Sequence, residues 1–131
     1  MTAVVIAGPH AHRQAGPIVI AVEDIAHLAP MLRAAGRFSL TTSGDIAIAL
    51  FGNSPAETEW MEGQVRLAVD LGARVALLPL CPDHDAPAIG AYLANCAPGL
   101  LIARFGGLAV PGDEDLAELS CALSCPLLLV R

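Results

Sequence analysis

The stretch Gly16-Pro17-Ile18-Val19-Ile20-Ala21-Val22-Glu23-Asp24 decides how the rest of the chain can be interpreted. Its apolar part, Ile18–Val22, is mostly β-branched, follows Gly-Pro and ends at two acids. A run that is apolar on both faces is typical of a strand covered by helices on both sides, at the centre of a parallel sheet. We therefore predict that Ile18–Val22 is the central strand of an α/β domain.

Further strands and helices are expected to alternate along the chain around this run. The expected strands are Thr2–Gly8, Ile18–Val22, Asp45–Phe51, Arg74–Leu80, Leu100–Phe105 and Leu127–Arg131. The expected helices are Ile25–Thr42, Pro55–Leu71, Ala86–Ala97 and Asp113–Ser124. Regular alternation with short loops predicts parallel strands, right-handed crossovers and helices on both faces.

We therefore expect a three-layer, doubly wound parallel five-stranded sheet in the order 3-2-1-4-5, counted from Ile18–Val22, with an extra N-terminal strand. A single domain is expected over residues 1–131, with the extra strand and a connector in 1–15 and the core in 16–131. Pro79 indicates that Arg74–Leu80 lies at an edge of the sheet, because proline cannot donate to a ladder.

Local signals predict where one helix begins and which of its residues are buried. Ser54-Pro55-Ala56-Glu57 predicts an N-cap serine, a first-turn proline and a capping-box glutamate. Met31 is expected in the core from the preceding helix. In the helix Pro55–Leu71, the residues expected to face the core are Trp60, Met61, Val65 and Ala68, although Trp60 could instead mark an interface.

Composition excludes several classes of function. The 131 residues are 55% hydrophobic, carry a net charge of −6 and contain no lysine. An acidic chain lacks the basic stripe that nucleic acid requires, and the missing lysine excludes a P-loop and Schiff-base chemistry. No apolar stretch approaches the ~20 residues of a membrane span, and no secretory signal is evident, so a cytoplasmic location is expected.

Metal binding and catalysis have little support in the sequence. The cysteines, which form no C-x-x-C pair and are expected to be reduced and mostly buried, are Cys81, Cys96, Cys121 and Cys125. His10 and His12, and the run Cys81–Asp85, contain metal-capable side chains without a second half, so no metal site is expected. The chain also has no G-x-S-x-G elbow, so we do not expect an enzyme.

Three stretches carry a resemblance to a known family. They are IVIAVED at 18–24, LGARV at 71–75 after a helix, and SCPLLLVR at 124–131. With them, the chain from Gly16 to Arg131 resembles the universal stress protein family, an adenine-nucleotide-binding α/β fold. The resemblance implies a homodimer formed through the last strand. Thr2–Gly8 also resembles a last strand of this family, and could pair beside Leu127–Val130 in its own chain or in a partner.

The loop that binds nucleotide in this family, G-x2-G-x9-G-[ST], is not matched here. Counting from Gly106, the later glycine positions hold Ala109 and Leu119, and three acids follow at 113–115, where phosphates would be repelled. Glu23 stands at the family's aspartate position, followed by Asp24. The departures imply a degenerate pocket without a bound cofactor, with ATP or AMP kept as the alternative.

A ligand of a doubly wound sheet binds where the strand order reverses, at the carboxyl ends of the strands. The candidate ligand-binding residues at this mouth are Val22, Glu23, Asp24, Arg104, Gly106, Gly107 and Gly112. The alternative is structural: Glu23 and Asp24 would cap the next helix, and the glycines would only form a turn.

Two functions are consistent with this sequence. The first is a non-catalytic regulatory or dimerisation module of universal-stress-protein type, which could belong to a larger membrane transporter or sensor. The second is an adenine-nucleotide-binding stress-response protein that uses Glu23, Asp24 and the Gly106–Gly112 loop in a non-standard way.

Overall fold

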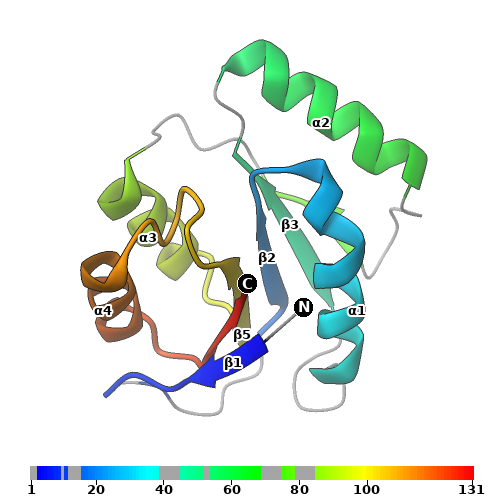
Figure 1. The fold of residues 1–131 in the computed structure, drawn as a ribbon. Coiled ribbons are helices and arrows are strands. Elements are labelled where there is room, and N and C mark those ends of the chain that lie inside the picture. The colour runs from blue at the N-terminus through cyan, green and yellow to red at the C-terminus, as the bar shows by residue number, and fades with distance from the viewer. Residues whose placement is uncertain are drawn as a thin grey trace.

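The computed structural model describes residues 3–9, 11, 16–38, 45–51, 54–68, 75–78 and 85–131. Strands and helices alternate through these residues, as the sequence predicted (Figure 1). In order they are β1 (Ala3–Ile6), β2 (Ile18–Val22), a 3-10 turn η1 (Ile25–His27), α1 (Leu28–Phe38), β3 (Ile46–Leu50), α2 (Pro55–Ala68), β4 (Val75–Leu77), α3 (Ala86–Asn95), β5 (Leu100–Arg104), α4 (Asp113–Ala122) and β6 (Leu127–Val130). No helix within these ranges is long and apolar enough to cross a bilayer.

The described strands form one mostly parallel sheet, in the order β1-β6-β5-β2-β3-β4. β2 pairs in parallel with β3 on one side and with β5 on the other, so Ile18 lies opposite both Ile46 and Leu100. β1 pairs antiparallel with β6 of its own chain, with Ala3 opposite Val130. The predicted α/β class is confirmed. β4 lies at an edge of the described sheet, as the proline at position 79 predicted.

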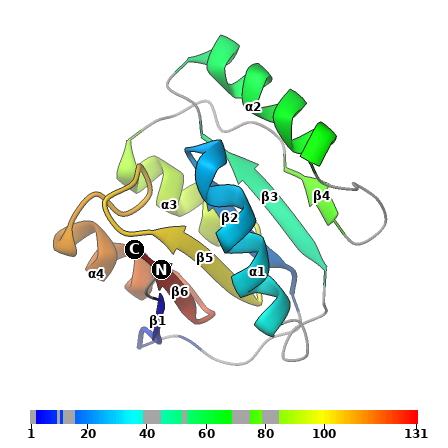
Figure 2. The same cartoon turned by 45° about the vertical axis from the view of Figure 1, so that its right-hand side comes forward.

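Helices cover both faces of this sheet, and β2 is buried between them (Figures 1 and 2). Successive strand residues point to opposite faces, so β2 contributes to two separate clusters. Ile18, Ile20 and Val22 pack with α1 and α2, whereas Val19 and Ala21 pack with α3 and α4. All five residues of β2 are at most 3% exposed, which explains why the run is apolar without alternation.

The start of α2 follows its sequence signal. The Ser54 hydroxyl accepts a hydrogen bond from the Glu57 N–H at 3.1 Å, as an N-cap does. Met61 and Val65 are buried one turn apart and fix the face that α2 turns to the sheet, and Met31 of α1 is buried beside them. The predicted burial of these three residues is confirmed.

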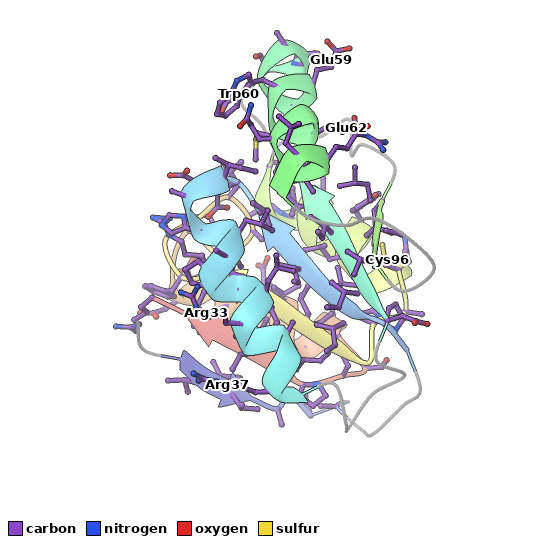
Figure 3. All side chains as sticks on the ribbon, turned by 90° about the vertical axis from the view of Figure 1, so that its right-hand side faces the viewer. Arg33, Arg37, Glu59, Trp60, Glu62 and Cys96 are labelled. Carbon is purple, nitrogen blue, oxygen red and sulfur yellow. The ribbon has the colours of Figure 1, made fainter. Side chains whose placement is uncertain are left out.

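The expectation that Trp60 faces the core is wrong. Its exposed fraction is 57%, and Figure 3 shows it projecting from the side of α2. The reason is helical geometry: residue 60 is rotated by about 100° from Met61, whose face is already packed on the sheet. The side chain of Ala68 lies outside the described residues.

The described cysteines are only partly buried, in contrast to the expectation. Cys125 is buried and Cys96 is half-buried, where its thiol donates to the Tyr92 carbonyl at 3.3 Å. Cys121 is exposed on α4, so the prediction is wrong for this residue. It lies two positions, about 200° of helical rotation, after Leu119, which is buried. All three are free thiols, and Cys81 lies outside the described residues.

Candidate functional site

The carboxyl ends of β2 and β5 meet at the point where the strand order reverses. These strands are parallel neighbours with Ile20 opposite Ile102, so Glu23 and Arg104 emerge at the same edge of the sheet. The loop that follows β5 folds back over this edge, and Phe105 forms a bridge with Val110. An open cleft of about 490 Å³ lies here. The residues that line it are Glu23, Asp24, Ala86, Arg104, Gly106, Gly107, Leu108 and Pro111.

Glu23 is held by the loop rather than by the helix that follows it in sequence. Its Oε2 accepts a hydrogen bond from the Leu108 N–H at 2.6 Å, and its Oε1 lies 3.5 Å from Nη1 of Arg104. The Glu23 side chain is 14% exposed and that of Arg104 is 33% exposed. A short hydrogen bond to an ionised acceptor is among the stronger kinds, so Glu23 ties β2 to the loop after β5.

Gly107 allows this close approach. A Cβ atom on residue 107 would collide with the Glu23 carboxyl group, so only glycine lets the carboxylate lie against the loop backbone. The neighbouring Gly106 has a φ of +88°, a conformation that other residues rarely adopt. The two glycines therefore have different tasks, one shaping the turn and the other making room for Glu23.

Three consecutive amides of this loop are engaged within the chain. The Gly106 N–H donates to the Val110 carbonyl at 2.8 Å, and the Gly107 N–H donates to the Arg104 carbonyl at 3.2 Å. The third amide, that of Leu108, donates to Glu23. These are the groups that a glycine-rich loop would otherwise offer to a phosphate.

Asp24 acts as a cap. Its Oδ1 accepts a hydrogen bond from the Ala26 N–H at 3.0 Å, so Asp24 is the N-cap of the 3-10 turn η1. The Asp24 side chain is 57% exposed at the mouth of the cleft. The structural alternative for the two acids therefore holds for Asp24, whereas Glu23 contacts the loop instead of capping the helix.

Five of the seven predicted site residues come together in the cleft, and two do not. Glu23, Asp24, Arg104, Gly106 and Gly107 line it. Val22 is fully buried in the cluster beneath α1 and α2. Gly112 is the N-cap residue of α4 and is not part of the lining.

The sequence did not identify Leu108, Pro111 and Ala86 as lining residues. Leu108 takes part through its backbone N–H, which every non-proline residue carries, so no side-chain signal could have found it. Ala86 comes from the first turn of α3, where the Asp85 side chain caps the helix by accepting from the Ala88 N–H at 2.8 Å.

The described lining of the cleft offers charge and hydrogen bonding. Among the described residues, those that line the cleft include no serine, cysteine, threonine, lysine or histidine to serve as a nucleophile or proton relay. Across the described ranges, no three His, Cys, Asp or Glu side chains are grouped to hold a metal ion. The histidines at 10, 12 and 84 and Cys81 lie outside these ranges, so that part of the metal prediction stays a prediction.

Cys125 is buried in the cluster that packs with α3 and α4, and it is not among the residues that line the cleft. Burial raises the pKa of its thiol from 9.0 to about 11, so the group stays protonated near neutral pH. A buried neutral thiol behaves as a small apolar side chain.

In comparisons with known proteins, no protein-family model and no curated protein matches this chain.

Proposed function

We propose that this protein is a non-catalytic regulatory or dimerisation module of universal-stress-protein type, whose nucleotide pocket is filled by its own side chain. The observation that carries the proposal is the Glu23 carboxylate on the Leu108 N–H, in a loop whose neighbouring amides are also engaged. Such a module would suit a cytoplasmic protein or the cytosolic part of a transporter or sensor.

Electrostatics favour this reading over phosphate binding. Glu23 lies where a loop amide and Arg104 would meet an anion, and Asp24 stands at the mouth. Two like unit charges 4 Å apart repel by about 4 kcal/mol at an effective dielectric constant of 20. A phosphate in this cleft would have to overcome that repulsion or displace Glu23.

The test is thermal unfolding of the purified protein with and without millimolar ATP, AMP and cyclic dinucleotides. A ligand at ~100 times its Kd would add about 2.7 kcal/mol and raise the midpoint by several degrees. We expect no such rise. A clear rise with any one nucleotide would overturn the proposal.

The same measurement tests the second candidate, an adenine-nucleotide-binding protein. The cleft of about 490 Å³ at the strand-order reversal favours it, since a cleft of this size accommodates a small molecule. A rise with ATP or AMP would support this candidate.

We further propose that the module forms a homodimer through the outer edge of β1. β6 is flanked by β5 and β1, so a dimer through β6 itself would require β1 to leave. Val4 and Val5 of β1 are each 51% exposed, and an apolar edge strand is a ready template for pairing.

Light scattering after size-exclusion chromatography measures this directly. The Val5→Lys variant should be a monomer if β1 is the interface, because an edge lysine opposes strand pairing. Leu67→Lys is the matched control, since Leu67 is exposed but lies on α2. A monomeric wild-type protein, or a dimer in Val5→Lys, would contradict the proposal.

A further inference from the structure

We infer that Glu23 is an internal stand-in for an anionic ligand. The Leu108 N–H and the Arg104 guanidinium form an anion site, the Glu23 carboxylate occupies it, and the site accepts a phosphate group once that carboxylate is removed. This inference rests on the proposed function, because it takes the self-filled cleft as the ordinary state of the protein.

Both oxygens of the carboxylate are used in the way a ligand anion would use its own. Oε2 accepts a hydrogen bond from the Leu108 N–H at 2.6 Å, and Oε1 lies 3.5 Å from Nη1 of Arg104. The donors come from β5 and its loop, whereas Glu23 directly follows β2. Glu23 is 85 residues from Leu108 and 81 residues from Arg104 in the sequence. The carboxylate is therefore brought to the donors by the tertiary structure, as a bound ligand would be.

The space that Glu23 fills is continuous with the cleft. The carboxyl group lies directly against the backbone at Gly107, where even a Cβ atom would not fit beside it. Truncating residue 23 at Cβ would thus uncover loop backbone at the wall of a cleft of about 490 Å³. Both released donors would face that space.

A compact oxyanion is the ligand class that these donors suit. A guanidinium group and a backbone N–H are the usual partners of phosphate oxygens, and both favour an ionised acceptor. In the wild-type protein the same donors are neutralised by Glu23, so the cleft discriminates against anions. Glu23 is therefore the residue that sets the ligand specificity of this site.

Asp24 provides the matched control. It contributes the same charge to the same cleft, but its contact is with the Ala26 N–H and it blocks no loop amide. Asp24→Asn removes this charge and can keep the cap, because asparagine is also a good N-cap residue. A general effect of negative charge would appear equally in Glu23→Ala and Asp24→Asn, whereas occupation of the site concerns only Glu23.

The experiment is a titration of ¹⁵N-labelled protein with inorganic phosphate, with chloride keeping the ionic strength constant. We expect Glu23→Ala to bind phosphate at least about tenfold more tightly than wild type, with the Leu108 amide resonance moving during the titration. Asp24→Asn removes a charge from the same cleft without freeing a donor, so it should gain much less affinity than Glu23→Ala. Adding Arg104→Ala to Glu23→Ala should remove the gain.

Two results would overturn the inference. One is equal phosphate affinity in Glu23→Ala and Asp24→Asn, and the other is an unchanged gain after Arg104→Ala is added. If Glu23→Ala does not fold, Glu23→Gln replaces it. The neutral amide is a weaker acceptor than the carboxylate, so the Leu108 amide proton resonance should move upfield. An unmoved resonance would refute the contact between residue 23 and Leu108. Nucleotide binding by wild type would contradict the proposed function, whereas a missing gain in Glu23→Ala would contradict only this inference.

Discussion

Glu23 and Gly107 form a pair in which each residue makes the other's position possible. The carboxylate can reach the Leu108 N–H only because residue 107 has no Cβ atom in its way. The pair joins two parallel strands at the edge where a ligand would bind. Its energetic coupling can therefore be measured by changing one residue in the presence and absence of the other.

Gly107→Ala should lower the free energy of unfolding by about 1–2 kcal/mol, because the Glu23 carboxylate would have to give up its hydrogen bond with the Leu108 N–H. In a Glu23→Ala background the same substitution should cost much less, since nothing remains to collide with the new methyl group. Chemical denaturation of the four proteins completes this double-mutant cycle.

Gly106→Ala is the control for this cycle. Its cost, about 1 kcal/mol, comes from the backbone φ of +88° rather than from Glu23. It should therefore be the same in both backgrounds. An equal cost of Gly107→Ala in both backgrounds would mean that Glu23 does not occupy the position described.

Cys125 should be protected from alkylation in the folded protein. Burial raises its pKa to about 11, and only the thiolate reacts, so at pH 8 iodoacetamide should modify the exposed Cys121 and leave Cys125 intact until denaturant is added. Between pH 9 and 11 the unfolded thiol loses its proton first, so the free energy of unfolding should fall as pH rises. Mass spectrometry of the labelled peptides checks the protection, and rapid labelling of Cys125 would contradict it.

At the scale of elements, helix starts are the best-determined feature of this chain. α2 and α3 each begin with a side chain that accepts a backbone N–H three residues later, from Ser54 and Asp85. A cap acts on neighbours within one turn, so the sequence alone contains the information. The buried face of α2 depends instead on how the helix packs on the sheet. This is why the prediction that Trp60 faces the core was wrong.

Ser54→Ala should lower the free energy of unfolding by about 1 kcal/mol, because the Glu57 N–H would lose its acceptor. Ser54→Asp should keep most of the stability, since aspartate caps equally well and its charge suits the positive end of the helix. Thermal or chemical denaturation distinguishes the two variants. Equal losses in both would show that the hydroxyl does not act as a cap.

At the scale of the whole molecule, β1 completes the sheet beside β6. All four residues of β6 are buried, and β1 covers its outer edge in an antiparallel register from Ala3–Val130 to Ile6–Leu127. Gly8 then passes so close to the backbone of Ser120 that a Cβ atom would not fit, which anchors the end of β1 on α4. The two ends of the chain thus stabilise each other.

Deleting residues 1–8 should lower the unfolding midpoint and promote aggregation, because it exposes the backbone groups and apolar side chains of β6. Gly8→Ala keeps the strand but disturbs its anchor, so it should have a smaller effect in the same direction. Differential scanning fluorimetry with light scattering measures both properties. A truncated protein that remained soluble and equally heat-stable would contradict this role of β1.

The sequence by itself determined the strands, the helices and the α/β class, because strand runs, helical spacing and caps depend on residues close together in the chain. It also indicated the edge where Glu23, Arg104 and Gly107 meet, since parallel strands end on one side. Only the tertiary structure decided that Glu23 contacts Leu108 across 85 residues and that β1 pairs within its own chain. The physical reason is that backbone donors and sheet edges carry no side-chain signal, so their partners emerge only when distant segments pack.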